Sequence, residues 1–596
     1  MNFYDFSGGI VNQKSPYLLK KDEALELCNF DVEQGGLTVR AGTIPKYGPF
    51  SGDVQSIHKA LSVKGHEILF VKSEEGVEML VGGVKCNLRM FCASFKVLPI
   101  IDGFAFLISG TPYHLQSVYR RVDGILPITG VWSGYVVLER LSDDYSTRGD
   151  FPSDLYETNI WDEDTKTLYY AKAHTNANRD NIKELLLGSQ FVALGHEGDL
   201  VYLQYTQASE IQLNLKKLYH EHTNFTYAMS YALSQIFRQI SPVEKTGQKA
   251  CACPYIVWHP ASMRYFAAGH PDYPTALFIS EPNDWYTYLP ENVLYPHLHL
   301  GKITGLSVVE KSVVVAYEHG WSHYVGSDPT EDGQWSLLSV PDGTRYGDTV
   351  CTTPGSVSFL SDSGLVSFSA SMLTVQMLYS PSSSLYKFLS KEKIALPMPK
   401  EKAFAFYRNG IYYLIVDDTM YLYHFTLGAF LCYRGLTCQC ITESYGGDIL
   451  MGSGKYVTVF SNSASTDYDP KTDSQIPFSY SVKIPILGAV DATALARSEE
   501  LAVVTKSLSC PADCHIRLSS EREEKEGTLL HTNHLSYGKT PWQYRYRDSA
   551  FSETVLPWQV TGNLFFLEIF GATNPQETLP FQIYNIYLKL KKERDK

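Results

Sequence analysis

The feature of this 596-residue sequence that most constrains its fold is a recurring pattern of short apolar segments separated by tight turns. One clear run comprises residues 303–309, 313–317 and 321–325. Because neighbouring segments are joined by only a few turn residues, they favour antiparallel strands that follow one another as a meander. Repetition at a spacing of roughly 40 to 50 residues fits the blades of a β-propeller better than a sandwich or a parallel array.

Hairpin pairs of the same character occur elsewhere in the chain. The strongest turn signal is Asn409-Gly410, because both residues tolerate the positive φ that a two-residue hairpin turn needs. The predicted pairs are 67–71 with 77–81, 97–100 with 104–108, 357–360 with 365–368, and 403–407 with 411–416. The 41 Tyr and 29 Phe residues suit pleated sheets, and the 43 Gly residues suit turns. We therefore expect a mainly β protein with a β-propeller-like core.

Changes of composition along the chain divide it into five predicted parts. They are 1–50, an N-terminal arm with a short helix; 51–130, the first propeller strands; 131–250, a mixed α/β insertion; 251–460, propeller blades; and 461–596, a C-terminal antiparallel β-sheet or sandwich domain. The acidic start and leucine spacing of residues 21–28 predict the short helix of the arm. Within the insertion, helices are predicted at 181–187 and 209–222, and a strand at 225–233.

The charge balance argues against a protein that grips nucleic acid. Lys and Arg total 51 against 64 Asp and Glu, so the net charge is −13, whereas tight nucleic-acid binders carry basic surfaces. No stretch reaches the roughly 18 apolar residues that a membrane span requires, and the first residues lack the features of a secretory signal. The eleven cysteines are expected to be reduced thiols of a protein made in a cytoplasm.

Several partial motifs for chemistry fail on spacing or residue type. Residues 361–364 lack the spacing of the Asp box of sialidase-type propellers, and residues 452–455 lack key residues of a phosphate-binding loop. The acidic run 162–164 is better explained as a solvated surface than as a glycosidase pair. The aspartates within 467–473 start like a calcium loop but lack its Gly and terminal Glu. We expect no catalytic, cofactor-binding or metal-binding residues.

Four cysteines leave one metal alternative open. Cys251 with Cys253, and Cys438 with Cys440, would offer four thiolates to zinc if the two pairs met in space. Structural zinc sites normally leave two to four residues between such cysteines. Residues two apart in a strand share a face, so buried thiols explain the same spacing. The sequence does not decide whether the four residues meet.

The first forty residues carry a pattern of a different kind. Residues 5–10 read Asp-Phe-Ser-Gly-Gly-Ile, 29–32 read Asn-Phe-Asp-Val, 35–37 read Gly-Gly-Leu, and 40–43 read Arg-Ala-Gly-Thr. Paired glycines supply positive φ or close backbone approach, so we expect this arm to pack against protein. The order of these motifs resembles the start of tail hub, tail nozzle and stabilisation proteins of short-tailed, podovirus-type bacteriophages.

A second stretch, residues 264–285, carries the same resemblance. It predicts a strand, a turn rich in Gly and Pro, and a second strand with polar residues at its end. It is similar to the R-x-F-x-x-G-x-P-x-Y-P-x-x-x-x-x-S-E pattern of these phage proteins. The resemblance extends weakly through the strand pairs between 303 and 425, and the insertion and the cysteines depart from it.

The resemblance implies a structural virion protein, not an enzyme. Such a protein is a subunit of the tail hub or nozzle ring through which DNA is ejected, with six copies expected in the ring. The implied partners are other copies of the chain, adaptor and portal-proximal tail proteins, tail fibre, spike or needle proteins, and DNA that passes without tight binding. Its implied location is the tail of the virion, after synthesis in the host cytoplasm.

The negative charge has a use in such a channel. An acidic wall repels the phosphate backbone, so DNA can slide without being held by Lys and Arg contacts. The alternative interpretation is a carbohydrate-binding or glycan-cleaving β-propeller that recognises a host receptor. An alternative of that kind needs a pocket of convergent polar groups, whereas a ring needs self-complementary surfaces.

Overall fold

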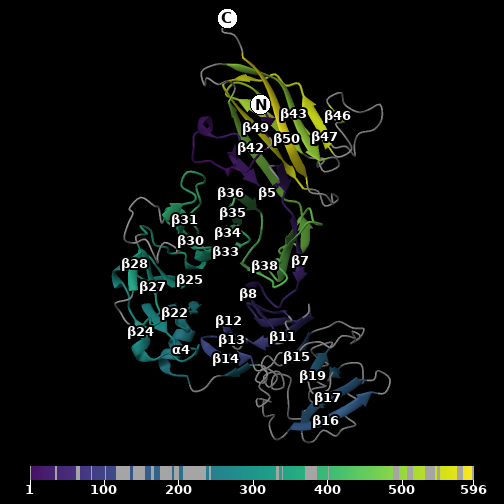
Figure 1. Cartoon of the computed structure of the whole chain (residues 1–596). Coiled ribbons are helices and arrows are strands. Elements are labelled where there is room, and N and C mark those ends of the chain that lie inside the picture. The colour runs from purple at the N-terminus through teal and green to yellow at the C-terminus, as the bar shows by residue number, and fades with distance from the viewer. Residues whose placement is uncertain are drawn as a thin grey trace. The chain divides into compact units, whose positions relative to one another are not determined.

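The computed structural model of the chain is mainly β, as the sequence predicts (Figure 1). It describes residues 2–3, 5–33, 36–61, 67–81, 84–90, 92–100, 103–115, 134–138, 155–162, 167–174, 191–193, 201–205, 237–239, 243–330, 335–338, 340–369, 386–400, 402–487, 495–506, 514–529, 544–546, 551–573 and 581–592. The predicted helices at 181–187 and 209–222 and the predicted strand at 225–233 lie outside these residues.

The chain divides into two compact units, and each unit is assembled from separate segments. Unit 1 comprises Met1–Lys46, Pro296–Cys438 and Thr458–Lys596. Unit 2 comprises Tyr47–Tyr295 and Gln439–Val457. Residues distant in sequence therefore build each unit together.

Unit 2 contains three four-stranded antiparallel sheets and smaller ones. The first sheet holds β8 (Val54–Leu61), β9 (Glu67–Ser73), β10 (Gly76–Val81) and β11 (Val84–Met90). The second holds β12 (Phe95–Ile100), β13 (Gly103–Ile108), β14 (Thr111–Leu115) and β20 (Phe237–Gln239). The third holds β21 (Tyr255–His259), β22 (Arg264–His270), β23 (Tyr273–Ile279) and β24 (Val293–Leu294). The hairpins predicted at 67–81 and 97–108 are confirmed.

The remaining described elements of unit 2 are short. They are α4 (Lys245–Cys251), the 3-10 turn Pro290–Asn292, β37 (Cys440–Glu443), β38 (Ile449–Ser453), and strands of the insertion: β15 (Gly134–Leu138), β16 (Leu155–Asp162), β17 (Thr167–His174), β18 (Phe191–Ala193) and β19 (Val201–Tyr205). Strands β16 and β17 form a hairpin, and β15, β19 and β18 form a three-stranded sheet. The sequence did not predict helix α4.

Adjacent sheets of unit 2 share apolar cores. The rings of Phe70, Phe95 and Phe106 join the first sheet to the second, with centroids 5.2 to 6.0 Å apart. Leu107 of the second sheet packs in another core with Tyr265 of the third. Because alternate residues of each strand face the neighbouring sheet, the period-two pattern of the sequence produces these contacts directly.

Unit 1 contains three further four-stranded meanders. The first is β25 (Ile303–Val309), β26 (Ser312–Tyr317), β27 (Gly320–Val325) and β28 (Trp335–Leu338). The second is β29 (Cys351–Thr353), β30 (Ser356–Ser361), β31 (Gly364–Ser369) and β32 (Tyr386–Phe388). The third is β33 (Ala403–Arg408), β34 (Ile411–Val416), β35 (Thr419–His424) and β36 (Ala429–Arg434). All the strand pairs predicted here are confirmed, and 3-10 turns occur at Leu298–Leu300 and Gly347–Thr349.

Local chemistry accounts for these meanders. Asn409 and Gly410 adopt φ values of 48° and 81°, a left-handed turn that Asn tolerates and that Gly adopts freely because it has no Cβ atom. Between the first two meanders, the Trp321 ring lies 4.4 Å from that of Phe359 and 5.0 Å from that of Phe368. These aromatic contacts close one core between the two sheets.

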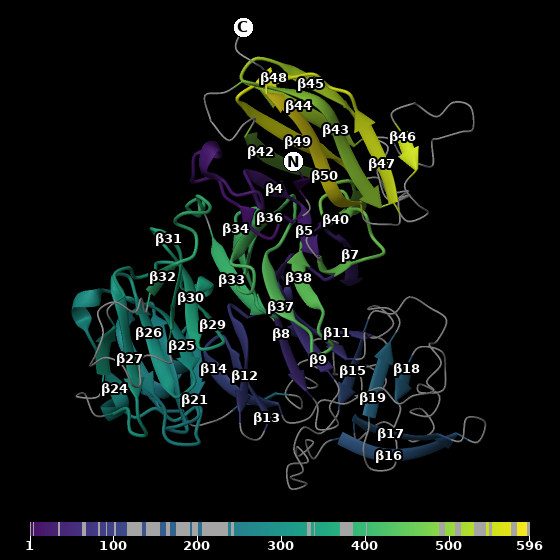
Figure 2. The same cartoon turned by 45° about the horizontal axis from the view of Figure 1, so that its top comes forward.

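The third meander continues into strands from both ends of the chain (Figure 2). The resulting nine-stranded sheet adds β4 (Glu26–Cys28), β42 (Ser479–Leu487), β49 (Leu564–Ala572), β44 (His515–Ser520) and β45 (Glu524–Thr528), in this order after β36. A second sheet has the order β46 (Tyr544–Tyr546), β47 (Phe551–Leu556), β43 (Ala496–Lys506), β50 (Gln582–Lys592), β6 (Gly36–Val39) and β5 (Phe30–Glu33). Strands β1 (Asn2–Phe3) and β48 (Thr561–Gly562) flank it on β50 and β43.

The two large sheets meet through aromatic side chains. The ring of Phe30 in β5 lies 5.5 Å from that of Tyr480 in β42, and Tyr480 lies 5.7 Å from Phe581. The strands predicted in the C-terminal region therefore exist, but they are completed by β4, β5 and β6 from the first forty residues. The remaining described strands of unit 1 are β40 (Asp467–Asp469) and β41 (Ser474–Ile476), together with most of β7 (Gly42–Tyr47) and of β39 (Tyr456–Ser461), each of which also includes residues assigned to unit 2.

The helix predicted at 21–28 is wrong. This segment forms β3 (Glu23–Ala24) and β4, and the arm's helical turn is a 3-10 turn at Pro16–Leu18. Strand β3 pairs in parallel with β2 (Gly9–Ile10), and β4 pairs with β42. An isolated helix of about eight residues is marginal in water, so strand partners supplied by the fold outweigh the local preference.

The arm packs against the later segments of unit 1, as its first glycine pair predicts. Gly9 has a φ of +64°, and a Cβ atom there would lie 2.5 Å from the carbonyl oxygen of Phe430. The backbone N–H of Asn12 donates to the carbonyl of Lys393 at 2.7 Å. In the second pair, Gly35 lies outside the described residues and Gly36 begins strand β6. The described residues include no helix with the length and apolar character that crossing a membrane requires.

A substitution at Gly269 tests whether the turn in the second motif stretch requires glycine. Gly269 has a φ of +83°, and a Cβ there would lie 2.8 Å from the Tyr255 ring. We expect Gly269→Val to lower the free energy of unfolding by about 3 kcal/mol, from backbone strain and this overlap together. Denaturant titration followed by tryptophan fluorescence measures the change.

Gly435→Val is the matched control. Gly435 has a φ of +82° but open space around its missing Cβ, so the same substitution should cost only the strain, about 1 to 2 kcal/mol. His270→Ala, which alters the next side chain and keeps the turn, should cost less than about 1 kcal/mol. Equal losses at Gly269 and Gly435 would show that the Tyr255 contact is unimportant.

Candidate functional site

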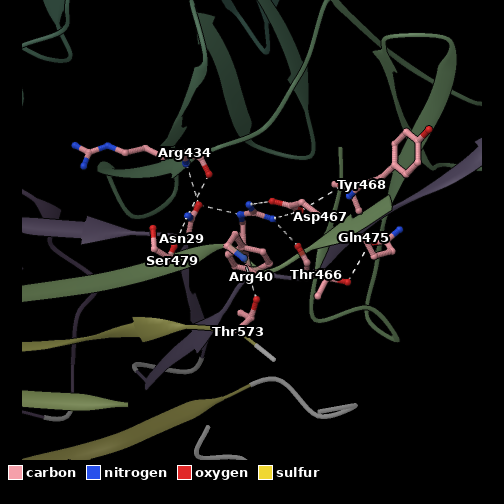
Figure 3. A network of polar contacts seen from close by, with 12 residues as sticks. Asn29, Arg40, Arg434, Thr466, Asp467, Tyr468, Gln475, Ser479 and Thr573 are labelled. Carbon is pink, nitrogen blue, oxygen red and sulfur yellow. Dashed lines mark hydrogen bonds and ion pairs between the residues drawn. The ribbon is translucent and has the colours of Figure 1, made fainter. Parts of the chain in front are cut away.

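A buried ion pair between Arg40 and Asp467 is the centre of a polar site in the described part of unit 1 (Figure 3). Each residue is 2% exposed. The guanidinium binds the carboxylate with two parallel bonds, Nη1 to Oδ1 at 2.9 Å and Nη2 to Oδ2 at 2.5 Å. Arg40 follows β6 and Asp467 begins β40, so the pair joins residues 427 positions apart. Two-point binding of this kind fixes the relative orientation of the two segments.

Asn29 extends the site toward three other segments (Figure 3). Its Oδ1 accepts hydrogen bonds from Arg40 Nε and from the backbone N–H of Arg434, both at 2.9 Å. Its Nδ2 donates to the carbonyl oxygens of Ser479 at 2.7 Å and Arg434 at 3.2 Å. Asn29 has a φ of 59°, a conformation that Asn tolerates better than most residues. The side chain therefore uses both donors and both acceptor positions to join β5, β36 and β42.

Gly42 and Thr43 complete the arrangement. Thr43 Oγ1 donates to Asp467 Oδ1 at 3.2 Å and accepts from the backbone N–H of Tyr468 at 3.0 Å. A Cβ on Gly42 would lie 2.1 Å from the carbonyl oxygen of Thr466, so no side chain fits at this position. Asn29, Arg40, Gly42 and Thr43 thus come from two of the opening motifs, 29–32 and 40–43, and they meet at one place.

Aromatic rings cover the buried charge. The guanidinium carbon of Arg40 lies 3.9 Å from the ring centroid of Phe478 and 5.4 Å from that of Tyr433. Burial raises the pKa of the Tyr433 phenol, and its hydroxyl donates to the carboxylate of Asp31. Arg40 also donates through Nη1 to the carbonyl of Ala41 at 3.0 Å. We call Asn29, Arg40, Thr43 and Asp467 the arm network, and its polar atoms are directed at other parts of the fold.

The polar residues of the second motif stretch, residues 264–285, also make structural contacts, in this case within unit 2. Arg264 Nη1 donates to the carbonyl of Ser280 at 2.8 Å and lies 3.8 Å from Glu281 Oε1. Ser280 Oγ accepts from the backbone N–H of Tyr265 at 2.8 Å, and Glu281 Oε1 accepts from Asn292 Nδ2 at 2.6 Å. The polar residues of this motif therefore hold the ends of β22 and β23.

The four cysteines of the zinc alternative occupy different surroundings. Cys251 and Cys253 lie in the apolar core beside α4, whereas Cys440 lies in β37. Burial raises the pKa of each of these three thiols to about 12. A thiol with so high a pKa stays protonated at neutral pH. Within the described ranges, no group of three or more His, Cys, Asp or Glu side chains is arranged to hold a metal ion.

The other partial motifs fall mostly in turns. Residues 362–363 form the turn between β30 and β31, and residues 454–455 form the turn between β38 and β39. Asp162 ends β16, and the next two acidic residues lie outside the described part of the chain. Asp467, which the sequence suggested only as the start of an incomplete calcium loop, is the partner of Arg40.

The role of Asp467 is not visible in the sequence. The sequence did place Arg40 in a motif beside an apolar strand, and a buried guanidinium needs an anion. Nothing local to Arg40 identifies which of the 64 acidic residues supplies it, since the partner is 427 positions away. The pairing of Arg40 with Asp467 is therefore known only from the structure.

Comparisons with known proteins give no family. No protein-family model and no curated protein matches the chain. PorZ, a surface component of the type-IX secretion system of Porphyromonas gingivalis, aligns with a TM-score of 0.29 and 8% identity over 75% of this chain and 44% of PorZ. An exo-beta-1,3-galactanase from Phanerochaete chrysosporium aligns with a TM-score of 0.18 and 9% identity over 56% of this chain and 80% of that enzyme. At these TM-scores the likeness supports no inference about fold or activity.

The arm network predicts a large effect from a small substitution. Asp467→Asn keeps the shape of the side chain but leaves the buried Arg40 charge without its anion. We expect the free energy of unfolding to fall by about 3 to 5 kcal/mol, as for other broken buried pairs. Thermal and denaturant unfolding of the purified variant measure this loss.

Asp362→Asn is the matched control, because Asp362 pairs with Arg345 at 3.7 Å while both side chains are more than half exposed. An exposed pair contributes about 0 to 1 kcal/mol, so this variant should unfold almost like the parent protein. If the two variants lost similar stability, the arm network would not be an important anchor.

Proposed function

We propose that the chain is a structural subunit of the tail hub or nozzle of a short-tailed bacteriophage. The observation that carries this proposal is the meeting of Asn29, Arg40 and Thr43 in the arm network, with Gly42 packed beside them against Thr466. These residues belong to the opening motifs on which the resemblance rests. Their shared structural task supports the view that the motif order describes one way of folding, not a chance similarity of short patterns.

We further propose that seven groups of four strands are the blades of a β-propeller. Five sheets of four antiparallel strands follow one another in the chain, beginning with β8, β12, β21, β25 and β29, and the sixth blade would be the meander β33–β36 within the nine-stranded sheet. A seventh has the order β37, β38, β39 and β7, so that a strand from near the N-terminus completes the last sheet. Seven blades lie within the usual range for propellers. The strands after β40, together with β4, β5 and β6, would form an attached β-sandwich.

In the proposed assembly, copies of the chain form a ring around the DNA exit channel, with six copies expected. Adaptor and portal-proximal proteins would contact one face, and fibre, spike or needle proteins the other. A closed ring requires the same pair of surfaces to meet repeatedly around one axis. The net charge of −13 supports a channel that DNA passes through without being held.

The ring can be tested directly. We expect native mass spectrometry and electron microscopy of the purified chain, alone or mixed with neighbouring tail proteins, to show a cyclic oligomer with an open central channel. A chain that stays monomeric in both conditions and binds or cleaves a glycan would contradict the proposal. That result would favour the alternative, a receptor-recognising propeller.

DNA binding gives a second test. Because an acidic surface releases few counterions from DNA, we expect weak binding to duplex DNA even at low salt, with an affinity no tighter than micromolar. Fluorescence anisotropy with a labelled duplex, measured over a series of salt concentrations, reports this affinity. Nanomolar binding at physiological salt would be inconsistent with a sliding channel.

A further inference from the structure

The seam between β36 and β4 contains two facing thiols. Within the described residues, these strands of the nine-stranded sheet are paired in parallel at one position, Cys432 opposite Cys28. Neither forms a disulfide, and they are 3% and 4% exposed. The seam joins the meander of β33–β36 to the strands that carry the C-terminal region, so a bond here would connect two parts of unit 1.

The backbone geometry suits a disulfide. Neighbouring strands lie about 4.7 to 4.9 Å apart, and the Cα atoms of bonded cysteines are usually about 4.4 to 6.8 Å apart. The backbone N–H of Asn29 donates to the carbonyl of Cys432 at 2.8 Å, which holds the two strands together next to the thiols. Bond formation therefore requires little movement of the chain.

The pKa values of the two thiols are shifted in opposite directions, so one is the nucleophile and the other its partner. A hydrogen bond from Cys432 lowers the pKa of the Cys28 thiol, with a further contribution from the positive charges of Arg434 and Arg40 and against the effect of burial. The same hydrogen bond, with burial, raises the pKa of Cys432. Arg434 lies beside the seam at the surface, where it pairs with Glu26 at 3.3 Å. Because the thiolate is the reactive form of cysteine, Cys28 reacts first.

We propose that Cys28 and Cys432 form an oxidisable pair that closes to a disulfide across the seam when the protein meets a peroxide. The Cys28 thiolate attacks one peroxide oxygen, the O–O bond breaks, and a sulfenic acid and hydroxide form. The Cys432 sulfur then attacks the sulfenic sulfur, the S–O bond breaks and the S–S bond forms. The two thiol protons and two hydroxides leave as two waters, and two electrons pass from the thiols to the peroxide.

The bond would matter because it closes a very long loop. Residues 28 and 432 are 404 positions apart, and disulfides that close longer loops remove more freedom from the unfolded chain. The disulfide would lie beside the arm network, where Asn29 already joins β36 to β42. A protein made with reduced thiols would thus gain stability after it leaves a reducing cytoplasm.

Peptide mapping of the intact protein tests the proposal. The full-length chain is treated with hydrogen peroxide under native conditions, unreacted thiols are alkylated after denaturation, and the digest is analysed by mass spectrometry. We expect a cross-linked peptide pair containing Cys28 and Cys432, with Cys251 and Cys253 still alkylated. We also expect the melting temperature to rise by about 3 °C or more, and a reductant to reverse the rise.

Two variants serve as controls. Cys28→Ser and Cys432→Ser should each lose the cross-link and the rise in melting temperature, and the mapping of the parent protein stays decisive if a variant folds poorly. The proposal is overturned if Cys28 and Cys432 both remain alkylated, or if Cys28 proceeds to a sulfinic acid without joining Cys432.

Discussion

The ion pair between Arg40 and Asp467 is the interaction on which the rest of unit 1 depends. Taking a guanidinium and a carboxylate out of water costs several kcal/mol for each ion, and the loss is offset only when geometry and further hydrogen bonds are good. Two parallel bonds, the Asn29 and Thr43 contacts and the Phe478 ring supply these conditions. The contacts that offset this cost come from the arm, β36, β40 and β42, so we expect the pair to be favourable only when these segments are together.

This dependence gives the first forty residues a role out of proportion to their length. Strand β4 lies between β36 and β42 in one large sheet, and β6 lies beside β50 in the other. The C-terminal strands thus need partners that are synthesised first, more than 400 positions earlier. Such long-range pairing slows folding, because the closure entropy of the chain is lost before the contacts form. Because the polar contacts of the arm network fit only one pairing of these distant segments, they favour the correct pairing over others.

Local signals in the sequence predicted local structure well. The hairpins around Asn409-Gly410 and the meander from Ile303 follow from turn chemistry and alternation, which act within a few residues. The interpretation of residues 21–28 as a helix failed, because their strand partners lie in β2 and β42 and no local pattern shows them. For the same reason, the sequence did not identify Asp467 as the partner of Arg40, since the two residues are 427 positions apart. The opening motifs were recognised as important, but a reason for the residue types of Asn29, Arg40 and Thr43 became visible only in the structure, where these three side chains meet in the arm network.

Hydrogen–deuterium exchange tests most directly whether the arm network locks the opening segment to the body. The backbone N–H groups of Asn29 and Arg40 donate to Cys432 and to Asn29, at 2.8 and 3.0 Å. If the network is an anchor, these amides open only with the surrounding sheets and exchange as slowly as the central strands β42 and β49. Exchange of residues 29–43 at the rate of an exposed loop, while β42 and β49 stay protected, would contradict the account.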